Sequence, residues 1–380
     1  MKKKKVMFFI YRMGSGGAAR TLLNILNHLD RQKFTPILVT LNFNGNYEPY
    51  LSPDIEFIKL KTKRLRAAIL PLARLIRRER PDILFSTIPV YNTVAILGKL
   101  LSFTKTKLIV REAALLGGSP RENATLRLFG CLYRFASKVI ALSQGVKENL
   151  VKRYRVKEEK IQVVYNPIDI DNIQQLAEHG EMPDEHREIF NNNSKIIVTA
   201  GRLVDEKDQK TLIKAFAKVQ KRLDCELIIL GEGEREYELK EIAKQLAVQH
   251  NVHFLGFQQN PYVYFKNADL FVLSSLREGF GHVLVESLAV GTPVVTTNCK
   301  PGAEEVLQNG EFGQITPVGD VDALADEIYA SLQLGELEKK HIIQKGIERA
   351  NDFAAPTIVR QYEAIFHDVV EQKRSDRQRS

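Results

Sequence analysis

The sequence has few cysteines and no long apolar run. Its three cysteines, Cys131, Cys225 and Cys299, lie far apart in a chain of 380 residues. An odd and scattered set excludes a disulfide framework and a cysteine-rich zinc site as the basis of the fold. It fits a reducing compartment such as the cytoplasm. No stretch approaches the ~18 consecutive apolar residues that a membrane-spanning helix needs.

The amino-terminal residues also lack the features of a secretory leader. Four lysines at positions 2–5 are followed by only six apolar residues before Arg12. A signal peptide needs a longer apolar core and a cleavage site of small residues. We therefore expect the protein to stay in the cytoplasm.

Charge is distributed unequally between the two halves. Residues 1–170 hold 31 lysines and arginines against 12 acidic residues, a net charge of +19, whereas residues 171–380 carry a net charge of −10. Such an asymmetry suggests that the first half meets an anionic partner: nucleic acid, a membrane surface or a phosphorylated substrate. The alternative is a solvated basic face with no partner, which an excess of this size disfavours.

The densest basic segment spans residues 59–80. Within it, Ile69, Leu72, Ala73 and Ile76 form an apolar stripe at helical spacing, with arginines around them. We expect the stripe to pack on the sheet and the basic residues to contact the anionic inner face of the cell membrane, at about 1 kcal/mol each. We expect no nucleic-acid partner, because no helix-turn-helix, RRM or KH signature is present.

Short apolar runs alternate with helical patterns in both halves. The expected strands are residues 5–11, 35–41, 82–87, 107–111, 139–143, 161–165, 195–200, 226–230, 252–255, 270–273 and 293–297. This order predicts an α/β protein with two doubly wound parallel-sheet domains of the Rossmann type, which face each other across a cleft. Residues 171–194 are polar, and we expect a linker or an irregular helix there.

A glycine-rich turn follows the first expected strand. Gly14, Gly16 and Ala19 fit the dinucleotide fingerprint G-x-G-x-x-A, in which the backbone and the start of a helix approach a phosphate. The second strand ends in residues 40–42, Thr-Leu-Asn, without the acid that would bind the ribose of NAD. NAD is therefore disfavoured, and a phosphate-facing loop and a merely tight turn both remain open.

The second half carries a denser pattern of charged residues. Arg202 and Lys207 follow the end of one expected strand, and Glu278 and Glu286 lie in a loop and in the helix after it, separated by seven residues. Two cations, two carboxylates and an open helix start suit a nucleotide diphosphate that carries a sugar. The cations would bind the phosphates and the carboxylates would bind vicinal hydroxyls.

This pattern, in register with residues 289–294, Ala-Val-Gly-Thr-Pro-Val, resembles the retaining glycosyltransferases of family 4. These group 1 glycosyl transferases have the two-domain GT-B fold, and the resemblance covers nearly the whole chain. It implies an acceptor-binding domain of residues 1–170, completed by a carboxyl-terminal helix at 356–372. It implies a nucleotide-sugar-binding domain of residues 171–355.

The resemblance also implies roles for single residues. Arg202 and Lys207 would act in catalysis by stabilising the donor diphosphate as it leaves, Glu278 would position the donor sugar, and Glu286 would bind the ribose. The other candidates for substrate binding are Gly16, Gly17, Gly231, Phe257, Gly281 and His282.

The chain departs from the family pattern at three places. Ala19 replaces an acid, and residues 299–305 differ from the relatives' Gly-Pro segment, which leaves the donor sugar open. Where many members have a histidine facing the sugar, a strand here ends in Arg111 and Glu112. Glu112 either takes the place of that histidine as a catalytic residue or pairs with Arg111, and both alternatives stay open.

The sequence does not call for a metal or another cofactor. Asp169-x-Asp171 and Asp320-x-Asp322 match the D-x-D pattern with which some sugar transferases hold a divalent ion. We expect Asp320 to cap the helix that follows it. Because two cations can neutralise the diphosphate, no metal is required, and the nucleotide sugar is a co-substrate.

We therefore predict a hexosyl- or N-acetylhexosaminyltransferase on the cytoplasmic face of the membrane. It would move a sugar, with retained configuration, from a UDP-sugar to a lipid-linked or polysaccharide acceptor in cell-envelope glycan synthesis. Two alternatives stay open. One is an enzyme of the same fold with other chemistry, such as a nucleotide-sugar epimerase, and the other is a non-catalytic module that binds membranes or anions.

Overall fold

The computed structural model describes residues 3–14, 16–191 and 193–377. The chain divides into two compact units, Met1–Pro167 with Ala355–Ser380, and Ile168–Ala354. The sequence pattern predicts these limits at residues 170 and 355. The Ile168 N–H donates to the Phe353 carbonyl at 2.8 Å, so the segments by which the chain enters and leaves the second unit lie side by side.

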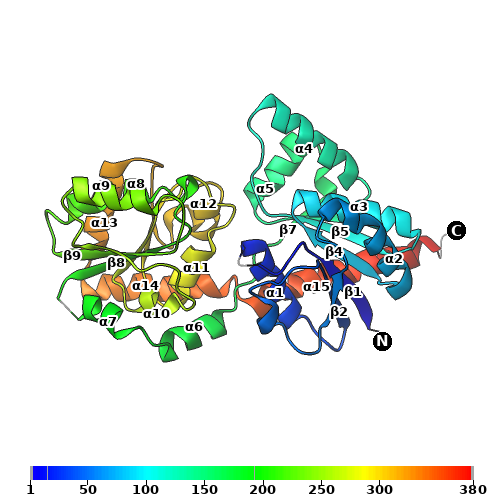
Figure 1. The fold of residues 1–380 in the computed structure, drawn as a ribbon, viewed down its shortest axis with the longest axis horizontal. Helices are drawn as coiled ribbons and strands as arrows, with labels where there is room; N and C mark the ends of the chain where they lie inside the picture. Colours follow the sequence, from blue (N-terminus) through cyan, green and yellow to red (C-terminus); the bar gives the residue numbers. More distant parts are fainter. Residues whose placement is uncertain (1–2, 15, 192, 378–380) are drawn as a thin grey trace. The chain divides into compact units, whose positions relative to one another are not determined.

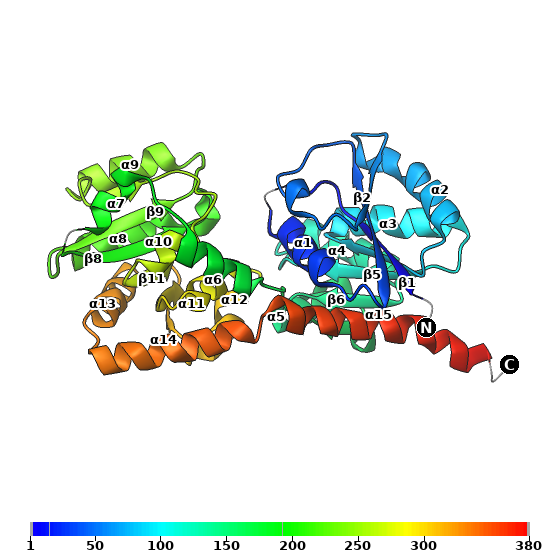
Figure 2. The same ribbon diagram turned by 90° about the horizontal axis from the view of Figure 1, so that it is seen from below.

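The first unit is built on a sheet whose described residues form seven parallel strands in the order β3-β2-β1-β4-β5-β6-β7. The strands are β1 (Lys4–Phe9), β2 (Phe34–Leu41), β3 (Glu56–Leu60), β4 (Ile83–Thr87), β5 (Lys107–Glu112), β6 (Lys138–Ala141) and β7 (Ile161–Val163). Helices cover both faces (Figures 1 and 2). They are α1 (Gly17–His28), α2 (Ile69–Glu79), α3 (Pro89–Ser102), α4 (Pro120–Tyr133), α5 (Gln144–Asn149) and α15 (Ala355–Arg377).

The last helix, α15, supplies part of the core of this first unit. Its Phe366 ring lies 5.9–6.1 Å from the rings of Phe8, Phe34 and Phe85, which come from three different strands. Figure 2 shows α15 running alongside this sheet, next to α1. The carboxyl-terminal helix therefore completes a core that the first 167 residues begin.

The second unit repeats the plan with a sheet whose described residues form six parallel strands in the order β10-β9-β8-β11-β12-β13. The strands are β8 (Lys195–Ala200), β9 (Cys225–Leu230), β10 (Val252–Phe254), β11 (Leu270–Leu273), β12 (Val294–Thr297) and β13 (Gln314–Thr316). On one face lie α8 (Gln209–Val219), α9 (Glu236–Gln245) and α13 (Val321–Leu332). The other face carries α10 (Tyr262–Lys266), α11 (His282–Ala289) and α14 (Glu336–Asn351) (Figure 1).

The predicted fold class is confirmed, because both units are parallel sheets between helices. For residues 171–194 we expected a linker or an irregular helix, and the linker alternative is wrong. Those residues form α6 (Ile170–His179) and α7 (Asp184–Phe190). Ile170, Ile173 and Ala177 of α6 are buried, so one side of a largely polar helix packs on the unit.

Candidate functional site

The predicted charged residues of the second unit lie after the carboxyl ends of its central strands. Lys207 ends a short 3₁₀ helix (Asp205–Lys207) that follows β8, and Glu278 lies in the loop that follows β11. Loops at the carboxyl ends of neighbouring parallel strands meet at one edge of a sheet, which is where such folds bind ligands. The topology thus explains how residues 71 positions apart come together.

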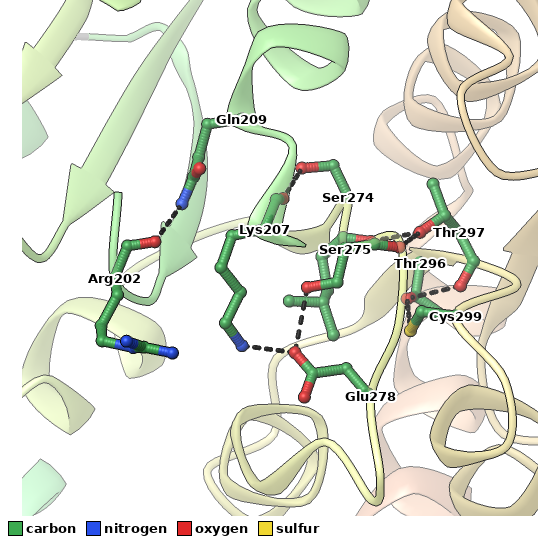
Figure 3. A network of polar contacts seen from close by, with 10 residues as sticks. Arg202, Lys207, Gln209, Ser274, Ser275, Glu278, Thr296, Thr297 and Cys299 are labelled. Atoms are coloured by element: carbon green, nitrogen blue, oxygen red, sulfur yellow. Dashed lines mark hydrogen bonds and ion pairs between the residues drawn. The ribbon is translucent and has the colours of Figure 1, made fainter. Parts of the chain in front are cut away.

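Lys207 and Glu278 form an ion pair at this edge (Figure 3). The Lys207 ammonium donates to Oε1 of Glu278, and the two side chains are 21% and 16% exposed. The Ser275 hydroxyl donates to the same carboxylate oxygen at 3.0 Å. Partial burial strengthens this pair relative to a fully exposed one, because less water screens the two charges.

The backbone of Glu278 is held by the segment that follows β12. Its N–H donates to the Cys299 carbonyl at 3.2 Å, and its own carbonyl accepts from the Gly302 N–H at 3.0 Å. A bridge pairs Glu278 with Pro301. The carboxylate is therefore carried by a loop fixed on both sides.

Hydroxyl side chains tie the two loops to the sheet. Ser274 Oγ donates to the Lys207 carbonyl at 3.0 Å, and Thr297 Oγ1 donates to the Ser275 carbonyl at 2.6 Å (Figure 3). These residues are absent from the site predicted above, although the sequence holds a signal for them. Ser274-Ser275 and Thr296-Thr297 are polar pairs at the ends of strands that are otherwise apolar.

Arg202 lies in the loop between β8 and the 3₁₀ helix. Its carbonyl accepts from Gln209 Nε2 at 3.0 Å, and its side chain is exposed. Figure 3 shows its guanidinium pointing to the same side as the Lys207 ammonium. A second cation is thus available beside the ion pair.

The second predicted carboxylate lies on α11. Gly281 precedes this helix with φ of 84°, a left-handed conformation that favours glycine. Glu286, in the second turn, is only 1% exposed. His282 begins the helix, half-buried, with its ring 5.6 Å from that of Phe280.

Gly231 joins the loops that follow β8, β9 and β10. Its φ is 131°, and a Cβ added there would lie 2.0 Å from the Gly201 carbonyl oxygen. Its N–H donates to the Gly256 carbonyl at 2.7 Å. Phe257, the residue that follows Gly256, is 65% exposed. An aromatic ring therefore lies in solvent next to the contact between Gly231 and Gly256.

In the first unit, the glycine-rich turn leads into α1. Gly16 is the residue before the helix, and a Cβ added to it would meet no atom within 4 Å. The Gly17 carbonyl accepts from Thr21 Oγ1 at 2.9 Å. Ser15 of the same turn lies outside the described residues. The unit itself therefore leaves open space at Gly16.

Glu112 ends β5 and is buried inside the first unit, 1% exposed. Its Oε1 accepts from the Tyr133 hydroxyl and, at 3.0 Å, from Asn92 Nδ2. Burial raises the pKa of this carboxyl from 4.5 to about 7. Its place as a catalytic residue stays a prediction.

The alternative that Glu112 pairs with Arg111 is wrong. Successive side chains of a strand point to opposite faces of the sheet. Arg111 donates instead to Asn166 Oδ1, to Thr87 Oγ1 at 3.2 Å and to the Tyr362 hydroxyl at 3.1 Å. Three neutral acceptors thus hold a buried guanidinium.

The first aspartate of each D-x-D motif caps the start of a helix. Asp320 accepts from the N–H groups of Asp322 and Ala323 at 3.1 and 3.0 Å, which confirms it as the cap of α13. Asp169 accepts from the Asn172 N–H at 3.4 Å at the start of α6. In the described part of the chain, no three His, Cys, Asp or Glu side chains are grouped so that they could hold a metal ion.

Comparison with known proteins identifies the chain. Residues 182–349 match the family model described as glycosyl transferases group 1, and residues 15–172 match glycosyltransferase family 4. A relative from Campylobacter jejuni is 31% identical over 94% of this chain and 98% of its own length. It is named N-acetylgalactosamine-N,N'-diacetylbacillosaminyl-diphospho-undecaprenol 4-alpha-N-acetylgalactosaminyltransferase. The chain is a glycosyltransferase of group 1, family 4.

Solved structures, one of them named as a glycosyltransferase, share the fold. One from Rickettsia africae superposes with a TM-score of 0.82 at 20% identity, over 98% of this chain and 100% of that one. Anabaena Alr3699/HepE, solved with UDP and glucose, has a TM-score of 0.79 at 23% identity, over 96% of this chain and 100% of that one. These matches confirm the predicted glycosyltransferase fold.

Among the residues that the structure describes, no helix is both long enough and apolar enough to cross a bilayer.

Proposed function

We propose that this glycosyltransferase moves a hexose or an N-acetylhexosamine from a UDP-sugar, with retention, to a lipid-linked or polysaccharide acceptor in cell-envelope glycan synthesis. The Campylobacter relative is named for an acceptor on diphospho-undecaprenol. A Staphylococcus aureus relative, 29% identical over 61% of this chain, is named as a capsular polysaccharide glycosyltransferase. Anabaena Alr3699/HepE has been solved with UDP-glucose, which supports a UDP-sugar donor.

The observation that carries the proposal is the ion pair of Lys207 and Glu278 with the exposed Arg202 beside it. As the bond between sugar and phosphate breaks, negative charge grows on the leaving diphosphate. Cations at that place stabilise the transition state more than the ground state. Lys207 and Arg202 are placed at one sheet edge, where they would perform this task.

The remaining predicted residues fit the other parts of a nucleotide sugar. Glu278 would accept from hydroxyls of the donor sugar, and the buried Glu286 would accept from the ribose. Phe257 is exposed next to the Gly231 junction and would contact the base. Gly16 and Gly17, at the start of α1, and Gly281 with His282, at the start of α11, offer backbone N–H groups where helix dipoles favour a phosphate.

We propose that the reaction needs no metal. The two cations Arg202 and Lys207 would supply the charge that a divalent ion provides in other sugar transferases. Transfer should therefore persist in EDTA. Loss of transfer in EDTA, with recovery on adding magnesium or manganese, would contradict this part of the proposal.

We also propose that the first unit contacts the anionic inner surface of the membrane. Residues 61–78 hold seven lysines and arginines and no acid. Leu72 and Ile76 of α2 are buried, whereas Arg74, Arg77 and Arg78 are exposed. The apolar side of α2 packs against α3. Arg77 donates to the Ser102 carbonyl at the end of α3, Arg78 pairs with Glu79 at 2.7 Å, and all three arginines keep exposed surface. Such a surface would bring the enzyme close to a lipid-linked acceptor.

A donor screen tests the proposed function. The purified protein is incubated with UDP-, GDP- and ADP-sugars in EDTA, and its melting temperature and the release of nucleotide are measured. We expect one UDP-sugar to raise the melting temperature and to be hydrolysed slowly. Candidate acceptors, undecaprenyl-diphosphate-linked sugars among them, are then added, and the anomeric configuration of the product is read by NMR.

The other outcomes separate the alternatives. Conversion of a UDP-sugar into another UDP-sugar without an acceptor would indicate an epimerase. Binding to anionic vesicles without binding of any sugar nucleotide would indicate a non-catalytic module. Inversion at the anomeric carbon would contradict retention while leaving the transfer itself in place.

A further inference from the structure

Lys207, the residue proposed to bind the donor diphosphate, is paired with an anionic side chain of the protein itself. Its ammonium contacts Glu278 Oε1, and neither side chain is more than 21% exposed. An incoming diphosphate therefore meets a cation whose charge is largely compensated. A carboxylate this close would also repel the phosphates.

Of the two partners, Glu278 is the fixed one. Backbone hydrogen bonds to Cys299 and Gly302, at 3.2 and 3.0 Å, hold its main chain, and Ser275 Oγ holds its carboxylate at 3.0 Å. Lys207 is fixed only through its backbone, by Val204 at 3.0 Å and by the Ser274 hydroxyl at 3.0 Å. Its ammonium stands on a flexible four-carbon chain and can leave the carboxylate.

We propose that Glu278 is an internal competitor of the diphosphate for Lys207. The inference rests on the proposed function and adds to it a device for product release. A complete donor compensates for the competition, because its sugar hydroxyls donate to Glu278. After transfer, the nucleoside diphosphate no longer carries the donor sugar whose hydroxyls would donate to Glu278. Lys207 then returns to Glu278, and the product binds weakly and leaves.

Glu278→Gln tests the competition, since it removes the charge and keeps the shape. We expect UDP to bind this variant about tenfold more tightly than the wild type, in isothermal titration calorimetry and as a lower inhibition constant against the donor. The KM for the donor should not fall in parallel, because the amide is a poorer acceptor for the sugar hydroxyls. A merely structural role of Glu278 would weaken UDP and donor together.

Two controls separate competition from a general change in charge. Asp205→Asn makes the same charge change on the 3₁₀ helix that carries Lys207, but Asp205 pairs with Arg235 and is 68% exposed. It should change the affinity for UDP by no more than about twofold. In a Lys207→Gln background, Glu278→Gln should give a clearly smaller gain, because only the direct repulsion between the carboxylate and the phosphates is then relieved.

The outcomes also distinguish this inference from the proposed function. A wild type that binds no nucleoside diphosphate would overturn both. A wild type that binds UDP, with equal or weaker binding by Glu278→Gln, would overturn the competition alone, as would an equal gain in Asp205→Asn. If Glu278→Gln does not fold by circular dichroism, Glu278→Asp withdraws the carboxylate by one carbon, and a gain in UDP affinity is expected there also.

Discussion

The guanidinium of Arg111 and the hydroxyl of Tyr362 lie 3.1 Å apart, although 251 residues separate them in the sequence. Both are fully buried, at 1% and 0% exposure. The contact joins the end of β5 to α15. It therefore ties the last helix of the chain to the sheet that the first 167 residues form.

Removal of this hydroxyl should destabilise the first unit. In Tyr362→Phe the Arg111 Nε–H loses its acceptor inside the core, and an unsatisfied buried donor costs about 1–3 kcal/mol. We expect this loss in the free energy of unfolding by denaturant titration. Tyr237→Phe is the control, because Tyr237 is 78% exposed, and it should change little. Equal stability of Tyr362→Phe and the wild type would show that the contact contributes nothing.

Glu112 should make stability depend on pH. Its pKa is raised from 4.5 to about 7 in the folded state. Between these values the folded state keeps a proton that the unfolded chain has lost, so the free energy of unfolding falls as pH rises through this window and stays lower above it. Glu112→Gln removes this loss. As pH rises from 4.5 to 8, the free energy of unfolding of this variant should therefore increase by roughly 1–3 kcal/mol relative to that of the wild type.

The measurement for Glu112 is a series of chemical denaturations across that pH range. Glu311→Gln, a change at an exposed glutamate, serves as the control and should leave the pH profile of the wild type unchanged. A difference between Glu112→Gln and the wild type that stays constant with pH would contradict the raised pKa.

Two glycines should respond oppositely to the same substitution. At Gly231 an alanine meets the Gly201 carbonyl oxygen at 2.0 Å and must adopt a φ of 131°, so Gly231→Ala should unfold or distort the loop. At Gly16 a Cβ meets nothing within 4 Å. Gly16→Ala should therefore keep the stability of the wild type and lower only donor affinity. A stable Gly231→Ala with normal nucleotide binding would contradict this account.

The basic surface of the first unit predicts salt-sensitive binding to anionic vesicles. Glutamine substitutions would be made together at four exposed residues: Lys61, Lys63, Arg64 and Arg66. At about 1 kcal/mol per charge, this variant should lose most of its binding in sedimentation with phosphatidylglycerol vesicles. Binding by the wild type should weaken as the screening length falls to ~10 Å near 0.1 M salt.

A matched variant controls for net charge alone. It carries glutamines at four exposed lysines of the second unit: Lys210, Lys214, Lys221 and Lys244. It should bind anionic vesicles as the wild type does. Equal binding of the wild type to neutral and anionic vesicles would contradict the membrane proposal.

The central strands of both sheets could be predicted from the sequence, because each is a short apolar run buried on both faces. The strands β3 and β13 could not. Polar residues interrupt both of them: β3 is Glu-Phe-Ile-Lys-Leu and β13 is Gln-Ile-Thr, so neither is an apolar run. The helix α14 is harder to predict because most of its 16 residues are polar and only Gly346 and Ala350 are buried, although Ile343 and Ile347 lie at helical spacing with them.

The candidate site, like the fold, could be predicted from the sequence only in part. Lys207 and Glu278 follow strand ends, so the sequence pattern was enough to place them in one region. Their direct contact depends on loop geometry, as does the support from Ser275, and no spacing rule encodes either. The Arg111–Glu112 alternative, in contrast, could have been excluded from the sequence, since adjacent strand residues face opposite ways.

The most direct test of the account is the rate of sugar transfer from a UDP-sugar by Lys207→Ala in the presence of EDTA. Lys210→Ala, a change at an exposed lysine of α8, is the control. We predict that Lys207→Ala lowers kcat by ~10²–10³, with a melting temperature close to that of the wild type, and that Lys210→Ala transfers normally. Normal turnover by Lys207→Ala would contradict the claim that this cation stabilises the departing diphosphate.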